Sequence, residues 1–396
     1  MKIVIVTNYP FPYGLAQTNR LIATAKGLIH ASSDVKVIIT KATETHEKTI
    51  NFDRIGNYEG INFEYTLPST IRPKGVTRRT YWFLKGLYCS FRLIAKEHKK
   101  EKIDAIFLGI TFNLVSFFFF VFCRLHNIKL LQERSEYPFL SYSKSMIGRI
   151  KLNIYLRLIC KFFDGFVVIS KPLKSYFSKY LRKDTPTFLL PILVETERFN
   201  FPEITIQPRI SYCGSMQGEK DGVPILIEAF AKIADKYLEI NLYLIGDNEF
   251  SGFTLLKERV SALNLEKRVI FTGRVEREQM PEKLSESLIL ALARPFTKQA
   301  EGGVPTKLGE YLATGRITIV TAVGDIPDYL SHKVNALLPA PGDVDDFAAN
   351  IEFALENNEL SKNIGEQGRI LAHNVFDYKT QGTLLFEWIN KVCKGD

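Results

Sequence analysis

The sequence contains little cysteine, and its cysteines form no recognisable pattern. There are 5 in 396 residues: Cys89, Cys123, Cys160, Cys213 and Cys393. No two of them are spaced as Cys-x-x-Cys. An odd number without such spacing argues against a disulfide framework and against a cysteine zinc site. We therefore expect a protein of the reducing cytosol.

A signal peptide and a long membrane span are also missing. The N-terminus, MKIVIVTNYP, begins with a strand-like run and lacks the basic, apolar and cleavage regions of a signal peptide. Residues 105–123 carry no formal charge and approach the roughly 20 residues that a span needs. Because Gly109, Asn113 and Ser116 interrupt this run, we predict a buried strand, a turn and a buried helix there.

Acidic residues are scarce in the first half of the chain. Residues 1–200 hold 31 Lys and Arg against 15 Asp and Glu, whereas residues 201–396 hold 21 against 28, so the net charge of +9 conceals two different halves. We expect the halves to face different partners. Basic residues interleaved with aromatics also suit nucleic acid, but no nucleic-acid-binding motif is visible, and we expect no nucleic acid partner.

Short runs rich in valine and isoleucine alternate with amphipathic stretches of helical length, which is typical of β-α units around parallel sheets. The predicted strands of the first half are 2–7, 35–39, 61–66, 105–109, 129–132 and 165–169. Those of the second half are 210–213, 242–245, 269–272, 288–293, 317–321 and 336–338. Two such sets indicate two doubly wound domains, 1–203 and 204–375. The amphipathic helix in 376–396 can cross back to the first domain in chains of this kind.

The densest motif is RPFTKQAEGGVPTKLGEYLATGRITIVTAVGDIPD, residues 294–328. A glycine-rich loop follows a strand, and Pro305 opens a helix that ends before Gly315. The start of that helix is suited to bind a phosphate through backbone N–H groups. The groups that we expect there belong to Gly302, Gly303, Thr306 and Lys307.

Glu310 shares one face of this helix with Thr306 and Lys307. Its carboxylate cannot favour a phosphate, but it can accept hydrogen bonds from sugar hydroxyls. The simpler alternative is a capped helix with a surface ion pair.

Three further glycine turns are predicted at the same sheet edge. ISYCGSMQGEKDGV places Gly214 and Lys220 after a strand, where the lysine can neutralise a diphosphate. LYLIGDN and VIFTGRV add Gly246 and Arg274. Together these turns indicate a cleft of nucleotide size.

Asp343 and Asp345 imitate the metal-binding Asp-x-Asp pattern. They lie at the predicted start of a helix, where its dipole favours acids. We therefore expect no metal site and no other cofactor.

The second half, about residues 205–375, resembles the C-terminal domain of retaining GT-B glycosyltransferases of family 4. The turns CGSMQGEKDGV, LIGDN and IFTGRV and the segment PTKLGEYLATGRITIVTAVGDIPDYL carry the resemblance. It implies two doubly wound Rossmann-like α/β domains facing each other across a cleft. It also implies a nucleoside-diphosphate sugar that contacts Lys220 through its diphosphate, the 306–308 backbone through its phosphates, Glu310 through its ribose and the 273–275 segment through its base.

This chain departs from that family in two places. Eight residues separate Glu301 from Glu310, where the family usually has seven, so Glu301 reaches the sugar only if the loop bulges by one residue. Ser215 stands where an arginine is usual, and we expect Arg274 or Lys307 to assist Lys220.

The first half resembles the family more loosely. MKIVIVTNYPFPYGLAQTNR looks like its first strand and glycine loop, which places Gly14 near the reacting sugar. A histidine usual in this domain is missing, and LLQERSEYP supplies Glu133, Arg134 and Glu136 instead. Arg134 is a candidate to bind an acceptor or a phosphate, and the two glutamates to bind acceptor hydroxyls. A buried ion pair is the alternative.

The candidate catalytic residues are thus Lys220, Glu301 and Arg134. The candidate donor-binding residues are Gly14, Gly214, Ser215, Lys220, Gly246, Arg274, Val275, Gly302, Gly303, Thr306, Lys307, Leu308 and Glu310.

Aromatic and basic residues alternate at helical spacing between Thr80 and Lys96. Such a helix can lie on an anionic membrane, where each basic residue contributes about 1 kcal/mol. Alternatively, it packs on its own sheet and leaves a basic face in water. Both interpretations stay open.

These features predict a cytoplasmic hexosyltransferase, peripheral on the inner face of the membrane if that helix binds lipid. It would move a hexose, with retention, from a nucleoside-diphosphate sugar to a saccharide or lipid-linked acceptor in polysaccharide or glycan synthesis. A sugar-nucleotide epimerase and a non-catalytic scaffold of the same fold are the alternatives.

Overall fold

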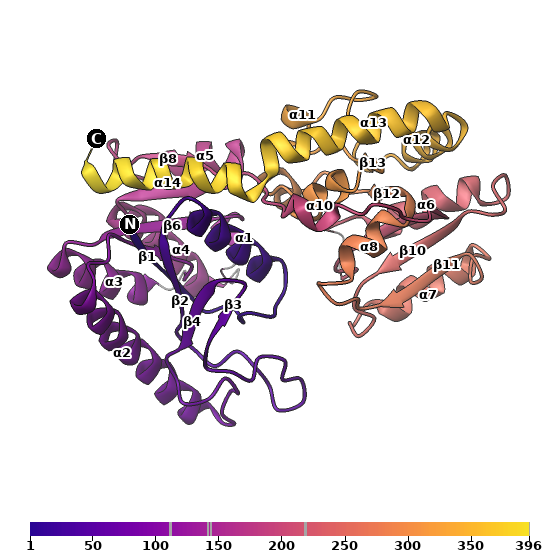
Figure 1. Cartoon of the computed structure of the whole chain (residues 1–396). Coiled ribbons are helices and arrows are strands. Elements are labelled where there is room, and N and C mark those ends of the chain that lie inside the picture. The colour runs from indigo at the N-terminus through magenta and orange to yellow at the C-terminus, as the bar shows by residue number, and fades with distance from the viewer. Residues whose placement is uncertain (111–112, 141, 143–144, 218–219, 396) are drawn as a thin grey trace. The chain divides into compact units, whose positions relative to one another are not determined.

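The computed structural model describes residues 1–110, 113–140, 142, 145–217 and 220–395. The chain divides into two compact units (Figure 1). Unit 1 comprises Met1–Leu193 and Tyr378–Asp396, and unit 2 comprises Val194–Asp377. Each unit is an α/β structure around its own sheet.

Unit 1 contains an eight-stranded sheet with the order β3-β4-β2-β1-β5-β6-β7-β8. Only β3 runs antiparallel to its neighbour, β4. The strands are β1 Lys2–Thr7, β2 Asp34–Ile39, β3 Ile55–Tyr58, β4 Ile61–Tyr65, β5 Ala105–Leu108, β6 Lys129–Arg134, β7 Gly165–Val168 and β8 Thr187–Leu189. All residues of β1, β5 and β7 are buried, as expected of parallel strands covered on both faces.

Helices cover this sheet, and the last helix of the chain is one of them. The helices of unit 1 are α1 Ala16–His30, α2 Val76–Lys100, α3 Asn113–His126, α4 Met146–Arg157, α5 Lys171–Ser178 and α14 Tyr378–Lys394. Helix α14, yellow in Figure 1, packs along α1. It buries Leu385 and Ile389 in the core of unit 1.

Unit 2 contains a five-stranded, wholly parallel sheet with the order β11-β10-β9-β12-β13. Its strands are β9 Gln207–Cys213, β10 Asn241–Ile245, β11 Val269–Gly273, β12 Ser287–Leu292 and β13 Ile317–Val320. Its helices are α6 Val223–Ala234, α7 Phe253–Ala262, α8 Met280–Ser285, α9 Lys298–Gly302, α10 Lys307–Ala313, α11 Ile326–Tyr329, α12 Val344–Glu356 and α13 Asn358–Leu371.

The boundary between the units lies before the predicted one at residues 203 and 204. Residues from Val194 onward belong to unit 2 because they bond to it: the Val194 N–H donates to the Phe376 carbonyl at 2.9 Å. The Thr196 hydroxyl donates to the Asp377 carboxylate at 2.7 Å. The second crossing lies between Asp377 and Tyr378, two residues beyond the predicted end of the domain.

The uncharged run at residues 105–123 forms β5 and most of α3, as predicted. The helix is less buried than expected, because Phe117, Phe118 and Val121 are exposed. In the part of the chain that the structure describes, no helix has the length and apolarity to cross a bilayer. The predicted strand at 336–338 is an isolated bridge from Leu337 to Ile319 of β13.

Tyr65 fixes the loop that follows β1. Its buried hydroxyl accepts from the Phe11 N–H at 3.0 Å and donates to the Phe11 carbonyl at 2.9 Å. The Thr43 hydroxyl lies 3.1 Å away from the same oxygen. One side chain at the end of β4 therefore satisfies both backbone groups of Phe11, in the loop that carries Gly14.

Tyr65→Phe should lower the free energy of unfolding by about 1–3 kcal/mol, because it leaves two buried backbone groups without their partner. Urea unfolding measures this change. Tyr81→Phe is the matched control, since Tyr81 is exposed and its loss of a hydroxyl should change stability by less than about 0.5 kcal/mol. Equal effects of the two substitutions would contradict this role for Tyr65.

Candidate functional site

The glycine turns of unit 2 meet at the carboxyl ends of its strands. The Gly214 N–H, after β9, donates to the Ile245 carbonyl of β10 at 2.8 Å. The Gly246 N–H donates to the Gly273 carbonyl of β11 at 3.1 Å. Neighbouring turns are thus tied together at one edge, where ligands of open parallel sheets usually bind.

A largely buried ion pair joins this edge to helix α10. The Lys307 ammonium lies 2.6 Å from an oxygen of Asp221, with the two side chains 15% and 10% exposed. The Tyr212 hydroxyl lies 3.0 Å from the same ammonium and donates to the Asp221 carboxylate at 2.9 Å. Burial opposes the charge of Asp221, but Lys307 outweighs it and holds the pKa of that carboxyl below its usual range.

Gly214 makes room for this pair. A Cβ at Gly214 would lie 2.0 Å from the Lys307 ammonium nitrogen, so any larger residue would displace the lysine. The φ of Gly214 is +147°, which L side chains rarely adopt. The turn after β9 therefore requires glycine for space and for backbone conformation.

Tyr311 anchors α10 to the end of β9. Its fully buried hydroxyl accepts from the Cys213 N–H at 2.6 Å. The start of α10 is consequently held by Lys307 on one turn and by Tyr311 on the next. This anchoring fixes the face that carries Glu310.

Glu310 is a half-buried carboxylate to which no hydrogen bond or close ion pair is made by the described residues. Burial raises the pKa of Glu310 above its usual range. The charges of Arg198 and Arg277 act in the opposite direction. Arg277 is itself ion-paired to Glu195, which limits how much it stabilises the carboxylate.

Backbone N–H groups accompany Glu310 at the start of α10. The Leu308 N–H donates to the Pro305 carbonyl at 3.0 Å, so one of the three expected donors is occupied. Among the described residues, the N–H groups of Thr306 and Lys307 have no backbone acceptor. They are the orphan donors that a helix leaves at its first turn.

Several of the residues predicted for this site lie at the surface or have another partner. Ser215, Lys220 and Arg274 are exposed, and Val275 is half-buried. Lys307, expected to face a diphosphate, points its ammonium at Asp221 instead, because Asp221 is buried and needs a cation.

The loop before α10 contains a short helix, α9. Glu301 lies on it and pairs with Lys298 at 2.7 Å. Gly302 is buried, and the Gly303 carbonyl accepts from Arg294 at 2.7 Å.

In unit 1, Arg134 ends β6 with its side chain 6% exposed. Its Nε has no hydrogen-bond partner, and its guanidinium lies 5.5 Å from the centre of the Tyr155 ring. Glu133 forms a largely buried ion pair at 2.5 Å, which is the alternative that we predicted for this loop, but its partner is Arg20 and not Arg134. Gly14 is half-buried in the loop after β1.

Asp221, Tyr212, Arg277 and Glu195 did not stand out in the sequence. Only Asp221 left a local signal, an acid directly after Lys220 in a glycine turn. The Arg277–Glu195 pair joins residues 82 positions apart, which no local pattern reveals.

No group of at least three His, Cys, Asp or Glu suited to a metal is found among the described residues. Asp343 caps α12 by accepting from the Asp346 N–H at 2.9 Å, so these acids begin a helix, as predicted.

Lys307→Met should destabilise the protein by about 3 kcal/mol, because it leaves the Asp221 carboxylate buried without its ammonium. Adding Asp221→Asn should recover at least half of that loss, which a double-mutant cycle from thermal or urea unfolding measures. Lys362→Met is the control, since its pair with Glu359 is exposed and contributes about 0–1 kcal/mol. If the effects of Lys307→Met and Asp221→Asn on the free energy of unfolding were additive, the two side chains would not be coupled and this role of the pair would be contradicted.

Comparison with known proteins agrees with this geometry. Residues 207–357 match the family model described as Glycosyl transferases group 1. N-acetyl-alpha-D-glucosaminyl L-malate synthase of Bacillus anthracis is 31% identical over 151 residues, which are 38% of this chain and 37% of that protein. The match therefore spans little more than a third of this relative's length.

Solved structures resemble the whole chain. Sucrose-phosphate synthase from Thermosynechococcus elongatus has a TM-score of 0.77 at 16% identity, with 100% of both chains covered. Anabaena HepE, in complex with UDP and glucose, has a TM-score of 0.72 at 16% identity, with 99% of this chain and 100% of that chain covered. Residues 207–357 thus match the model of the glycosyl transferases group 1 family, and the chain as a whole has the GT-B fold of two Rossmann-like α/β domains.

Proposed function

We propose that this protein is a retaining hexosyltransferase that takes its sugar from a nucleoside-diphosphate donor. The observation that carries the proposal is Glu310, a half-buried carboxylate without a hydrogen-bonded partner among the described residues, at the open start of α10. A protein gains nothing in stability from a carboxylate whose charge is disfavoured by burial. A ligand with hydroxyl donors would supply the missing hydrogen bonds.

The ribose of a nucleotide provides two neighbouring hydroxyls of this kind. With Glu310 on the ribose, the N–H groups of Thr306 and Lys307 are available for the phosphates. HepE in complex with UDP and glucose and the family of residues 207–357 both support a nucleotide-sugar donor.

In the proposed reaction the bond between the sugar anomeric carbon and the diphosphate oxygen breaks. A bond to an acceptor hydroxyl oxygen forms on the same face of the sugar, and the hydroxyl proton passes to a donor phosphate oxygen or to a base. Negative charge grows on the leaving diphosphate. We assign its stabilisation to Lys220, Arg134 and the N–H groups of α10, in place of a metal ion.

Gly14 and Glu301 keep the roles proposed from the sequence, near the transferred sugar. The acceptor would be a saccharide or a lipid-linked saccharide in polysaccharide or glycan synthesis. An epimerase of the same fold would convert a donor without any acceptor, and a scaffold would bind no donor at all. A donor assay with and without acceptor therefore separates the three.

Glu310→Gln should reduce the thermal shift that a nucleotide sugar produces. UDP-, GDP-, ADP- and dTDP-glucose are tested on the wild type first, and the donor giving the largest shift is used for the variant. Loss of charged hydrogen bonds to a ribose should weaken binding by about tenfold or more. An unchanged shift in the variant would sink the assignment of Glu310.

The same variant should stabilise the free protein near neutral pH. Burial raises the folded pKa of Glu310 above its ordinary value of 4.5, so ionised Glu310 costs stability from that pH upward, and the cost is complete above the folded pKa. The melting temperature of Glu310→Gln should exceed that of the wild type at pH 7 and match it at pH 4. Glu282→Gln, at an exposed position in α8, should change neither stability nor donor binding.

We further propose that helix α2 binds an anionic membrane surface. Its exposed aromatic and aliphatic residues include Tyr81, Leu84 and Tyr88, at 60%, 58% and 61% exposure, and they follow helical spacing. Lys85 lies 5.8 Å from the Tyr81 ring and Arg92 lies 5.8 Å from the Tyr88 ring. Aromatic rings flanked by cations suit the headgroup boundary.

Replacing Arg78, Lys85 and Arg92 together by glutamine should weaken binding to vesicles of anionic lipid by about a hundredfold, at about 1 kcal/mol for each charge. Co-sedimentation at low salt measures this change. The control replaces three exposed lysines of unit 2, Lys257, Lys267 and Lys362, and should retain binding. Failure of the wild type to sediment with these vesicles would refute the membrane proposal.

A further inference from the structure

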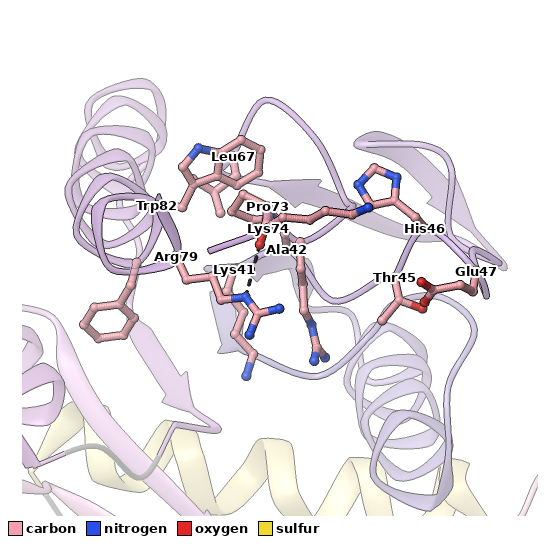
Figure 2. Close-up of a pocket in the computed structure, with 12 residues that line it drawn as sticks. Lys41, Ala42, Thr45, His46, Glu47, Leu67, Pro73, Lys74, Arg79 and Trp82 are labelled. Atoms are coloured by element: carbon pink, nitrogen blue, oxygen red, sulfur yellow. Dashed lines mark hydrogen bonds between the residues drawn. The ribbon is translucent and has the colours of Figure 1, made fainter. Parts of the chain in front are cut away.

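A cavity of about 380 Å³ lies in unit 1, at the carboxyl ends of β2 and β4 (Figure 2). Lys41 and Ala42 follow β2 closely, and Leu67 follows β4. Gly14 lies in the loop after β1, and Arg134 is the last residue of β6. Both strands run parallel to β2 and β4 in the same sheet, so these two residues lie at the same edge of the sheet as the cavity. The cavity is therefore on the side of the sheet where open α/β domains bind ligands.

Hydrogen bonds between its walls hold the cavity open. The Glu44 N–H donates to the Thr70 carbonyl and the Arg72 N–H donates to the Glu44 carbonyl, both at 2.9 Å. The Glu44 carboxylate accepts from the N–H groups of Ile50 and Asn51 at 2.9 and 3.3 Å. It is thereby committed to the loop that carries Thr45, His46 and Glu47.

Helix α2 closes one side of the cavity because Gly86 lets it approach β2. A Cβ at Gly86 would lie 2.2 Å from the Thr40 carbonyl oxygen. This close contact positions Trp82 and Phe83, one turn earlier, in the cavity wall. One wall is thus helical, whereas the other lining residues lie in the loops that follow β2 and β4.

Positive charge dominates the lining. Lys41, Arg72, Lys74 and Arg79 all line the cavity, whereas Glu47 is the one acid among its described lining residues. None of the four cations has a carboxylate oxygen within 4.0 Å in the described part of the chain. Arg79 is held in place by a hydrogen bond from its Nε to the Pro73 carbonyl at 3.1 Å, the dashed line in Figure 2.

Burial and a neighbouring like charge both disfavour the charged form of Lys41. Burial and the neighbouring Arg72 lower the pKa of the Lys41 ammonium. Four cations that line one cavity without a carboxylate repel one another, and an anion inside the cavity would reduce that repulsion. Phosphate groups form strong, charge-assisted hydrogen bonds with lysine and arginine side chains.

The apolar part of the lining adds a second kind of recognition. Trp82, Leu67 and Pro73 line the same space as the cations. An aromatic ring beside charged groups can pack against the apolar face of a sugar while the charges hold a phosphate. This combination separates the cavity from a simple basic surface.

We infer that this cavity binds the phosphate-bearing part of the acceptor, a phosphorylated saccharide with its phosphate on Lys41 and Arg72 and its sugar on Trp82. That this ligand is the acceptor rests on the proposed transferase function, whereas the binding of a phosphorylated saccharide to the cavity does not. The phosphate can belong to a soluble sugar phosphate or to a lipid headgroup.

Trp82 provides a direct readout, because the chain has 2 tryptophans. The other, Trp388, has its ring centre 5.5 Å from that of Phe188 in unit 1, with the two rings tilted. In a Trp388→Phe background, fluorescence therefore reports on the cavity alone. The protein is titrated with glucose 1-phosphate, and separately with phosphatidylcholine vesicles that contain or lack phosphatidic acid.

A saturable change with glucose 1-phosphate supports the inference with a soluble source, and a change only with phosphatidic acid vesicles supports it with a lipid source. In either case Lys41→Gln combined with Arg72→Gln should weaken binding about tenfold or more. Lys96→Gln combined with Lys99→Gln removes the same charge from the exposed far end of α2 and should retain the affinity within about twofold.

The inference is overturned if neither probe changes Trp82 fluorescence, or if the cavity variant and the control respond alike. Because no donor or turnover is involved, its failure leaves the donor shift of Glu310 intact. Loss of that donor shift with the Trp82 response preserved would instead count against the proposed transferase function alone.

Discussion

A buried ammonium is stabilised where a carboxylate replaces its water, and the Lys307–Asp221 pair meets that condition at the sheet edge of unit 2. The same carboxylate accepts the Tyr212 hydroxyl and lies 3.7 Å from Arg294. The turn after β9, the end of β12 and the start of α10 are thus fixed by one set of charges. Moving any of them would leave at least one charge buried without its partner.

This pair also determines which groups remain for chemistry. Lys307 lies in the loop–helix motif that suggested phosphate binding, yet its ammonium is committed to Asp221. What α10 offers a ligand is therefore backbone N–H groups and the Glu310 carboxylate. In the proposed reaction, those N–H groups and cations outside α10 offset the negative charge on the leaving diphosphate. The proposed cations are Lys220, which is exposed, and Arg134, which is buried and whose Nε has no hydrogen-bond partner.

Much of the fold was predictable, because buried parallel strands leave a strong local pattern. KIVIVT and AIFL are read correctly as strands β1 and β5 since all their residues are buried. The strands β3 and β8 were missed because they are short, lie at the two edges of the sheet and are not fully buried. The domain boundary was misplaced because long-range bonds, such as that from Val194 to Phe376, decide it.

For the site, the local pattern identified the segments but not their pairings. The glycine turns and the start of α10 could be predicted because each of them requires a particular type of residue, glycine or proline, at one position. The pairing of Lys307 with Asp221, 86 positions away, could not be predicted. Many other acidic residues of unit 2 could equally well have balanced the charge of Lys307. Glu133 gives a second example: it forms the predicted buried ion pair, but with Arg20, which lies 113 positions away in the sequence.

Charge asymmetry along the chain acquires a physical meaning from these pairings. Buried or half-buried cations with a carboxylate close by occur in both units, as in Lys307–Asp221 and Arg209–Glu286 of unit 2 and Arg20–Glu133 of unit 1. Arg134 and the cations around Lys41 differ from these, because they lie at the sheet edge of unit 1 without such carboxylates. A domain tolerates uncompensated cations at a cost in stability, and that cost is offset when an anion binds. The excess of basic residues in the first half agrees, at this edge, with the anionic ligands that we propose.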